Sequence, residues 1–225
     1  MKVQCDVFKF NPDSDTEGRF VTYTLDVEAS DTVLDALIQI YQDYDPALAF
    51  RYACGVVRCG ECAMLINGSP YLACEKSVEP VMKIEPLPRL PLIKDLVVDR
   101  REVFDRVFRM LPRLSGLEET KSRLRSLDPE AAKESIEQSV QLSKCFECLI
   151  CQSSCPLSAN KKDVFVGPLG LLWLAQMCVN PANKSIPKQE VEQALAPCLR
   201  CGVCSRKCPA EDDLISIALD VLDKQ

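Results

Sequence analysis

The sequence predicts an α+β domain followed by an all-helical domain. Apolar and polar residues alternate over residues 3–7 and 21–27, as in half-buried strands, and from Lys94 onward apolar residues recur at helical spacing. The prolines of EPLPRLPL, at positions 86, 88 and 91, separate the two patterns. We therefore expect one domain at residues 1–95 and a second at residues 96–225, and 47% hydrophobic residues are enough to build a core.

The first half is expected to place several strands around one helix. Strands are predicted over residues 3–7, 21–27 and 81–85, and on both sides of Asn67-Gly68, a pair typical of a tight hairpin. Ser30 or Asp31 is expected to cap the helix, whose apolar residues from Val33 to Tyr41 share one face. These elements together predict a small α+β domain.

The second half is expected to be helical throughout. Apolar spacing predicts helices over residues 103–111, 167–179, 187–196 and 214–222. A further helix is expected to begin at Asp128-Pro129, with the aspartate as cap and the proline as first residue. Residues 167–179 are almost entirely apolar, so this helix is expected to be buried.

The composition excludes several classes of function. The chain has no histidine, which rules out Cys2His2 zinc sites, a His-ligated Rieske centre and a histidine general base. A net charge of −6 without a dense Lys/Arg cluster argues against nucleic acid as a partner. The longest nearly apolar stretch, Leu169–Val179, is shorter than the ~20 residues of a membrane-spanning helix. The N-terminus lacks the apolar core of a signal peptide, so a cytoplasmic chain without a transmembrane segment is expected.

Fourteen cysteines are the most informative feature of the composition. Disulfides are disfavoured because thiols stay reduced in the cytosol. Zinc uses the same thiolates, and C-x2-C pairs alone do not exclude it. Iron–sulfur clusters need four thiolates each at particular spacings, and those spacings are present.

One cysteine set has the C-x4-C-x2-C spacing of plant-type [2Fe–2S] sites, completed by a later cysteine: Cys54, Cys59, Cys62 and Cys74. The short loop can wrap its sulfurs around one side of a cluster. Gly55 and Gly60 allow the backbone to come close because neither carries a Cβ. The hairpin at Asn67-Gly68 returns the chain, so that Cys74 can reach the same place. A zinc knuckle is the alternative, although the x4 spacing is less usual for zinc.

The second half carries the run C-x2-C-x2-C-x3-C-P twice, ending at Pro156 and at Pro209. In such runs three cysteines hold one [4Fe–4S] cluster and the fourth serves the other. One set is therefore expected to be Cys145, Cys148, Cys151 and Cys208. The other is expected to be Cys155, Cys198, Cys201 and Cys204. Cys5 and Cys178 remain, and both are expected to be buried thiols that behave as small hydrophobic residues.

These cysteine patterns, in this order, resemble the iron–sulfur subunit of the succinate dehydrogenase/fumarate reductase family. The segments CGECAMLINGSPYLAC, IEPLPRLPLIKDLVVD and FVGPLGLL support the resemblance, which covers nearly the whole chain. It implies a β-grasp [2Fe–2S] ferredoxin domain followed by an α-helical ferredoxin domain. It also implies an FAD-bearing partner that interconverts succinate and fumarate, with electrons passing through three clusters. No residue of this chain is then a candidate acid, base or nucleophile.

The chain departs from the quinone-linked members of that family in two respects. Those members have a [3Fe–4S] third centre and an aliphatic residue where Cys201 stands here, so a second [4Fe–4S] cluster is expected. The alternative is that Cys201 is a thiol near the third cluster and does not bind it. The family's quinone pocket uses a tryptophan shortly after the first C-P and a histidine after the first cysteine of the last run. Here those places hold Pro156–Asn160 and Leu199, and Trp173 lies further on in the apolar helix, where it is expected to be core.

The first hypothesis is that the chain is a subunit of a succinate:acceptor or fumarate reductase complex. Two alternatives remain: a stand-alone ferredoxin-like carrier and a structural zinc protein. The expected partners are an FAD-containing subunit and a membrane-anchor or cysteine-rich redox subunit. Through these partners the chain is expected at the inner face of the cell membrane.

Overall fold

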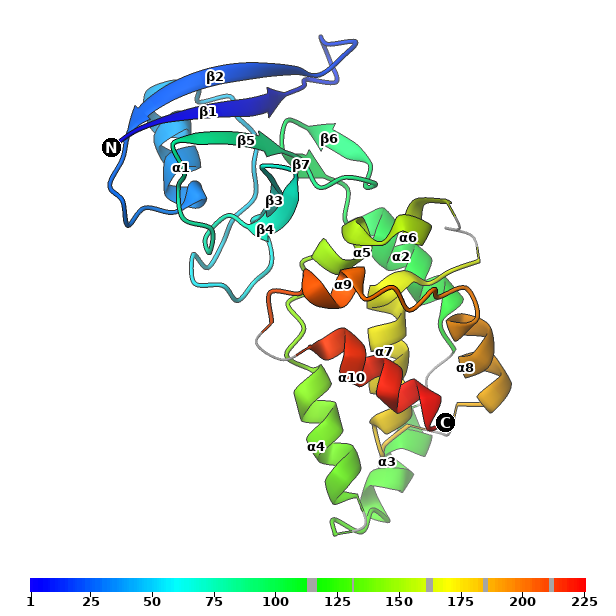
Figure 1. The fold of residues 1–225 in the computed structure, drawn as a ribbon. Helices are drawn as coiled ribbons and strands as arrows, with labels where there is room; N and C mark the ends of the chain where they lie inside the picture. Colours follow the sequence, from blue (N-terminus) through cyan, green and yellow to red (C-terminus); the bar gives the residue numbers. More distant parts are fainter. Residues whose placement is uncertain (113–116, 131, 161–163, 184–185, 211–212) are drawn as a thin grey trace. The chain divides into compact units, whose positions relative to one another are not determined.

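The computed structural model describes residues 1–112, 117–130, 132–160, 164–183, 186–210 and 213–225 (Figure 1). The chain divides into two compact units. The first contains Met1–Val103 together with Phe146–Ser154, and the second contains Phe104–Cys145 together with Cys155–Gln225. The first unit thus extends past the predicted boundary at residue 95 and includes Phe146–Ser154 from the half expected to be helical, and the division at residue 95 stays a prediction.

The first unit is built on a mixed five-stranded sheet of order β2-β1-β5-β3-β4. Its strands are β1 (Lys2–Lys9), β2 (Arg19–Asp26), β3 (Ala63–Ile66), β4 (Ser69–Leu72) and β5 (Val81–Glu85). The central strands β1 and β5 are parallel, and the other pairs are antiparallel. The helix α1 (Val33–Asp43) buries its apolar face in this unit (Figure 1). A mixed sheet holding one helix is the expected β-grasp arrangement, which confirms the predicted fold class of this half.

The N-cap of α1 lies one residue after Asp31, the later of the two caps that the sequence predicted. Thr32 is the N-cap: its hydroxyl accepts from the Asp35 N–H at 3.3 Å, and the Asp35 carboxylate accepts from the Thr32 N–H at 2.8 Å. This is a reciprocal capping box. The predicted cap at Ser30 or Asp31 is therefore wrong, and the Asp31 carboxylate instead accepts from the Glu28 N–H at 2.9 Å.

The predicted hairpin at Asn67-Gly68 joins β3 to β4. Both turn residues have positive φ, 49° at Asn67 and 74° at Gly68, as a type I′ turn requires. The Asn67 side chain also accepts from the Lys83 N–H at 2.7 Å, which ties the turn to β5. The hairpin thereby returns the chain to Cys74, as the sequence predicted.

A small second sheet that the sequence did not predict spans the expected boundary between the two halves at residue 95. The strands β6 (Leu92–Lys94) and β7 (Val97–Val98) pair antiparallel. In their turn, the Asp95 side chain is completely buried and accepts from three donors: Phe10 N at 2.8 Å, Ala49 N at 2.8 Å and Lys9 Nζ at 3.1 Å. Asp95 therefore joins β1 to the segment that leads into the first cysteine loop.

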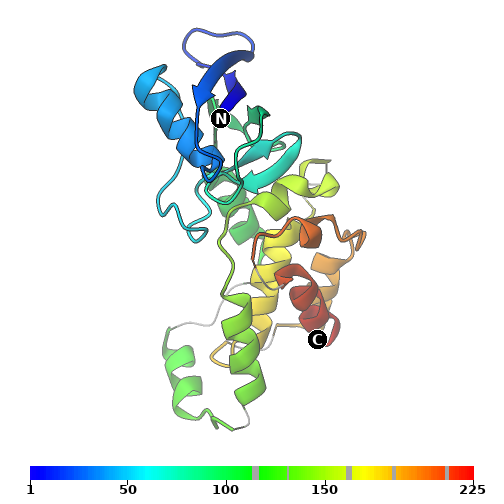
Figure 2. The ribbon, with the colours of Figure 1, turned by 60° about the vertical axis from the view of Figure 1, so that its left-hand side comes forward.

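The described elements of the second unit are all helical, and α7 (Gly167–Val179) lies at its centre. The helices α4 (Lys133–Leu142), α8 (Lys188–Leu195) and α10 (Leu214–Asp223) pack against α7 (Figure 2). The remaining helices are α2 (Arg101–Met110), α3 (Leu117–Arg125), α6 (Pro156–Asn160) and α9 (Val203–Arg206). One short helix, α5 (Ile150–Ser154), belongs to the first unit. The predictions for α7, α8 and α10 are confirmed, and α7 is mostly buried.

Two predictions in the helical half are corrected. Asp128-Pro129 does not open a helix: the Asp128 side chain accepts from the Glu130 N–H at 3.1 Å in a turn, and α4 begins at Lys133. Trp173 is only partly buried and is not part of the core. Its ring stacks on Phe104 with centroids 5.8 Å apart and lies tilted against the exposed Phe108 with centroids 4.7 Å apart. Across the described residues, no helix has both the length and the apolar character needed to span a bilayer.

Candidate iron–sulfur sites

The loop from Cys54 to Cys59 surrounds one sulfur with backbone donors. The N–H groups of Val56, Arg58 and Cys59 each donate to Cys54 Sγ at 3.4 Å. These bonds, the one from Val56 first, lower the pKa of the Cys54 thiol to about 7. The loop therefore favours the thiolate, which is the form that binds iron.

The other two cysteines of the first set come together at the ends of the β3–β4 hairpin. The Cys62 thiol donates to Cys74 Sγ at 3.4 Å, and both side chains are buried. Burial, followed by the neighbouring Cys74, raises the pKa of Cys62 to about 12. The structure thus places the Cys62 and Cys74 sulfurs side by side and puts the Cys59 backbone N–H against Cys54 Sγ, and the four-cysteine set as a whole stays a prediction. Because the pKa of Cys62 is raised, its thiol would lose the proton only beside a cation, and bound iron would be such a cation.

Each of the three cysteine loops contains two residues of positive φ separated by one residue. In the first loop these residues are Gly55 and Val57, and Gly60 further along also has positive φ. In the later loops they are Glu147 and Leu149, then Arg200 and Gly202. Such alternation turns successive N–H groups toward one side and forms a concave anion-binding nest, a feature of many iron–sulfur sites. The backbone of each loop therefore fits a negatively charged cluster.

Gly60 brings the first cysteine loop against the second. A Cβ at this position would lie 2.5 Å from the carbonyl oxygen of Phe146 and 2.8 Å from Cys148 Cβ. Only glycine allows this approach, since its φ of +69° is also strained for other residues. The sequence singled out Gly60 for close approach to a cluster, and the structure shows that protein backbone is also close.

Two arginines hold the Phe146–Ser154 segment in the first unit. The Arg100 guanidinium pairs with the Glu61 carboxylate and donates to the Glu147 carbonyl oxygen at 2.6 Å. The Arg89 guanidinium donates to the Ser153 carbonyl oxygen. Each arginine thus fixes a residue that lies between predicted ligand cysteines. Sequence reasoning missed both, because a single arginine carries no spacing signal.

The members of the second predicted set fall in both units. Cys148 and Cys151 belong to the first unit, and Cys145 and Cys208 belong to the second. Cys148 is buried and the other three are half-buried. Burial, followed by the negative charge of Asp213, raises the pKa of the Cys208 thiol.

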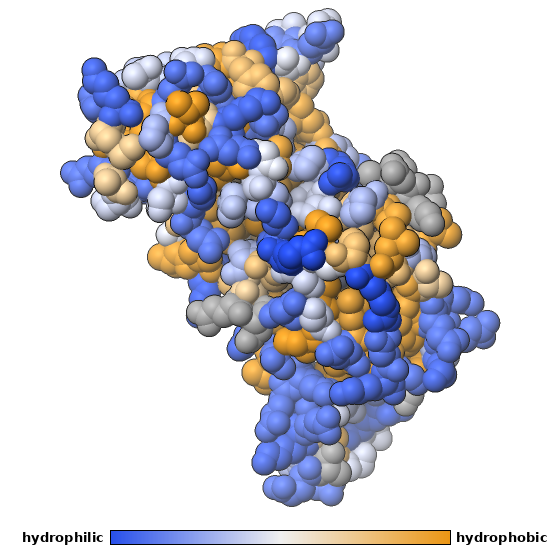
Figure 3. Space-filling view, viewed as in Figure 1, coloured by the Kyte–Doolittle hydropathy of each residue, from blue (hydrophilic) through white to orange (hydrophobic). Residues whose placement is uncertain are grey.

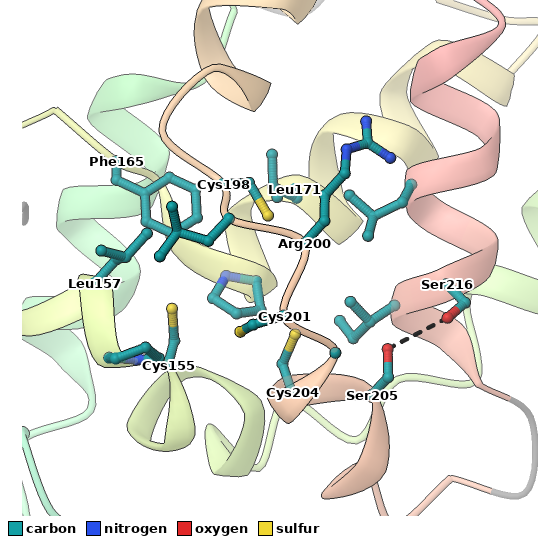
Figure 4. Close-up of a pocket in the computed structure, with 16 residues that line it drawn as sticks. Cys155, Leu157, Phe165, Leu171, Cys198, Arg200, Cys201, Cys204, Ser205 and Ser216 are labelled. Carbon is teal, nitrogen blue, oxygen red and sulfur yellow. Dashed lines mark hydrogen bonds between the residues drawn. The ribbon is translucent and has the colours of Figure 1, made fainter.

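The third predicted set lines a single cavity in the second unit. Its four members, Cys155, Cys198, Cys201 and Cys204, all contribute to the wall of a space of about 120 Å³. Figure 4 shows their sulfur atoms gathered around this space, with Cys155 approaching from the start of α6 and the other three from the 198–204 segment. The volume is well above the roughly 10–15 Å³ that one water requires. A cavity with four thiols in its wall is better suited to holding an iron–sulfur cluster than to remaining an empty apolar void.

The rim of this cavity carries apolar and charged side chains. Leu199 is 67% exposed, and Arg200 forms an ion pair with Asp223 at 2.8 Å. Figure 3 shows apolar side chains at the surface beside α9 and α10, interrupted by charged ones. Ser158 is buried and its hydroxyl donates to the Cys155 carbonyl oxygen at 3.0 Å. The side chain of Asn160, the other polar residue expected here, lies outside the described residues.

The two cysteines outside the three sets are isolated thiols. Cys5 is fully buried on β1, and burial, followed by the charge of Asp6, raises its pKa to about 11. Cys178 is half-buried, and burial raises its pKa to about 11. In the part of the chain that the structure describes, no three His, Cys, Asp or Glu side chains are arranged to hold a single metal ion.

The chain matches two protein-family models. Residues 4–105 match a 2Fe-2S iron–sulfur cluster binding domain, and residues 141–211 match a 4Fe-4S dicluster domain. The first match contains the whole first cysteine set, and the second contains both later sets. They agree with the predicted change from a mixed-sheet [2Fe–2S] domain to a helical ferredoxin domain.

Curated relatives match over most of this chain. The chain is 32% identical over 219 residues to a fumarate reductase (CoM/CoB) subunit of Methanothermobacter marburgensis, covering 97% of this chain and 42% of that protein. It is 30% identical over 214 residues to the succinate dehydrogenase iron–sulfur subunit of Paracoccus denitrificans, covering 90% of this chain and 80% of that protein. The chain thus spans about two fifths of the methanogen relative and most of the Paracoccus one.

A solved structure agrees with the sequence relatives. A chain of the Mycobacterium smegmatis Sdh1 complex in the apo form superposes with a TM-score of 0.80 at 25% identity, covering 100% of this chain and 97% of that one. The cysteine geometry, the two domain models and these relatives point the same way. The chain belongs to the family of succinate dehydrogenase and fumarate reductase iron–sulfur subunits.

Proposed function

We propose that this chain carries electrons between an FAD-containing succinate/fumarate subunit and a second redox partner, without binding the organic substrate itself. The observation that carries the proposal is the cavity walled by Cys155, Cys198, Cys201 and Cys204. Iron–sulfur clusters supply one-electron chemistry over a wide range of potentials. The protein's part is to hold the thiolates, direct N–H groups at them and exclude water.

Three clusters are proposed, each with four cysteine ligands. A [2Fe–2S] cluster is assigned to Cys54, Cys59, Cys62 and Cys74, and a [4Fe–4S] cluster to Cys145, Cys148, Cys151 and Cys208. A second [4Fe–4S] cluster is assigned to Cys155, Cys198, Cys201 and Cys204, in place of the family's usual [3Fe–4S]. The matched 4Fe-4S dicluster model supports two such clusters. The first domain is proposed at residues 1–95 and the second at 96–225.

The role of Cys201 decides the type of the third cluster. Cys201 contributes to the same cavity wall as the three other thiols, which supports a ligand role. We expect the wild-type protein to contain the iron of one [2Fe–2S] and two [4Fe–4S] clusters. Cys201→Ile should convert one [4Fe–4S] signal to [3Fe–4S]. Cys178→Ala is the matched control, because it removes a thiol outside all three sets and should change no cluster signal.

Anaerobic iron and sulfide analysis with Mössbauer spectroscopy measures these outcomes. A [3Fe–4S] signal in untreated wild-type protein would refute the assignment of Cys201. Zinc without stoichiometric iron would refute the iron–sulfur proposal as a whole.

We propose that the electron acceptor or donor beyond the third site is another redox protein, either cysteine-rich or a membrane anchor, and not a quinone bound beside that site. A quinone carbonyl needs hydrogen-bond donors where charge develops on reduction. Leu157 and Leu199 offer no side-chain donor, and the Ser158 hydroxyl is engaged by the Cys155 carbonyl. The name of the Methanothermobacter relative, a CoM/CoB fumarate reductase, supports an acceptor chemistry other than quinone for that branch.

The partners are tested by purifying the complex from its native cells. We expect a flavoprotein and a further redox subunit to co-purify, and the assembly to sit at the inner face of the cell membrane through them. Recovery of the chain alone, still loaded with clusters and active with several enzymes, would favour a stand-alone carrier. A quinone-site inhibitor seated against Leu199 would refute the proposed acceptor.

A further inference from the structure

One glycine of the first cysteine loop touches a cysteine of the second loop. A Cβ on Gly60 would lie 2.8 Å from Cys148 Cβ and 2.9 Å from Cys148 Cα. That Cβ would be one bond of about 1.5 Å from Gly60 Cα, so the Cα lies within about 4.3 Å of Cys148 Cβ, which is van der Waals contact. Both residues belong to the first unit. The two loops therefore meet inside this unit, at a position where the glycine has no side chain to hold them apart.

This contact joins ligands of two proposed clusters by a short route. Gly60 directly follows Cys59, a proposed ligand of the [2Fe–2S] cluster. Cys148 is a proposed ligand of the first [4Fe–4S] cluster. Between these two cysteines lie one residue and one non-bonded contact. An electron that follows this route leaves the covalent chain only once.

Arg100 ties the same two loops together beside the contact. Its guanidinium pairs with the carboxylate of Glu61, the residue after Gly60. It also donates at 2.6 Å to the carbonyl oxygen of Glu147, the residue before Cys148. Arg100 thus bonds to a chain neighbour of each residue in the contact. A guanidinium suits such a bridge because its donors have a fixed planar arrangement, and this side chain is only 12% exposed.

The bridge acts through geometry more than through charge. Arg100 and Glu61 form an ion pair that carries no net charge. Cluster potentials depend on net charge and on hydrogen bonds to the sulfurs. The two bonds of Arg100 described above both end on oxygen. Their main effect is therefore to fix the distance between the two loops.

We propose that Arg100 is a positioning residue for electron transfer between the first two clusters, and that the electron crosses at the contact of Gly60 with Cys148. The step moves one electron from a reduced site to an oxidised one, and no bond is made or broken. Its rate depends on the separation of the two sites, which the Arg100 bridge holds constant. This inference rests on the proposed assignment of these two clusters.

The test measures electron exchange in the intact complex. The double variant Arg100→Gln/Glu61→Gln removes the ion pair but leaves the net charge unchanged. After photoreduction, rapid-freeze EPR follows the electron between the [2Fe–2S] and [4Fe–4S] signals. We expect the double variant to slow this exchange roughly tenfold or more, because a misplacement of about 1 Å can cost about a hundredfold in rate. The magnetic interaction between the two reduced clusters should weaken, and both reduction potentials should keep their wild-type values.

Two further variants separate the bridge from a general effect of arginine. Arg101→Gln is the matched control, because Arg101 is exposed and is the next residue in the chain. It should leave the exchange rate unchanged. Arg100→Lys keeps the charge but loses the planar fork, so its rate should fall between those of the wild type and the double variant.

The outcomes distinguish this inference from the proposed function. Wild-type protein without both kinds of cluster signal would overturn the cluster assignment, and this inference with it. Both signals present, with the double variant exchanging electrons as fast as Arg101→Gln, would refute the role of Arg100 alone. Slower exchange together with shifted potentials would show an electrostatic role and would also contradict positioning. If the double variant loads no clusters, Arg100→Lys is measured in its place, and failure of both to load would show that the bridge serves assembly instead.

Discussion

Replacing Gly60 by alanine tests the close approach between the first two cysteine loops. The added Cβ would meet backbone, 2.5 Å from the Phe146 carbonyl oxygen and 2.9 Å from Cys148 Cα. Atoms of the main chain cannot rotate aside as a side-chain end can, so the Phe146–Ser154 segment must shift. We expect Gly60→Ala to displace this segment and to disturb the thiols of both loops.

The magnitude follows from two separate costs. A residue with a Cβ pays roughly 1–2 kcal/mol for the left-handed conformation, and overpacking typically adds about 1–3 kcal/mol. Gly68→Ala supplies the matched control: its φ of +74° is as strained, but a Cβ there meets nothing within 4 Å. Gly68→Ala should therefore lose free energy of unfolding only through the left-handed conformation.

The free energy of unfolding of both variants is measured by urea titration, with visible absorbance and iron content reporting the clusters. Gly60→Ala should lose roughly 1–3 kcal/mol more than Gly68→Ala and should bind less iron. Equal losses in the two variants, with wild-type iron content in both, would show that the approach of the two loops is not a structural requirement.

Two further predictions concern the polar core of the first unit. Asp95→Ala leaves the buried Lys9 ammonium with only Asp45 as partner. It should therefore lower the free energy of unfolding by about 3–5 kcal/mol, measured by urea denaturation. A loss under about 1 kcal/mol would contradict this role. Burial, followed by the hydrogen bond to Asp45, raises the pKa of Tyr23 from 10.0 to about 12. The unfolded chain then releases this proton first, so stability should fall between about pH 10 and 12. Tyr23→Phe should lack this fall in a series of thermal melts, and an identical pH profile in both proteins would count against it.

The elements that the sequence predicted correctly are those with many residues in a regular pattern. The apolar run of α7 and the alternation in β1 and β2 each repeat several times, and Asn67-Gly68 suits few conformations other than a tight hairpin turn. The four thiols of the third set could be grouped from spacing alone, and the structure places them around one cavity.

The sequence-based predictions failed where a residue pattern suits two different structures or where an element is too short to show a pattern. Asp-Pro suits the first two positions of a type I turn as well as a helix start, and at Asp128 the chain forms a turn. The strands β6 and β7 have three and two residues, which is too few to show alternation. The roles of Arg89 and Arg100 depend on contacts with residues that are distant in sequence, so no local signal could reveal them.

The composition of the first unit has a consequence for the order of events during synthesis. Met1–Val103 emerges first, but the unit also needs Phe146–Ser154, which Arg89, Arg100 and Gly60 hold against it. All five strands of the main sheet lie before Val103, but the last segment of the unit is made roughly 50 residues later, or about 3–10 s at 5–20 residues per second. During that interval the surface around Gly60 lacks the Phe146–Cys148 backbone that packs against it in the finished unit.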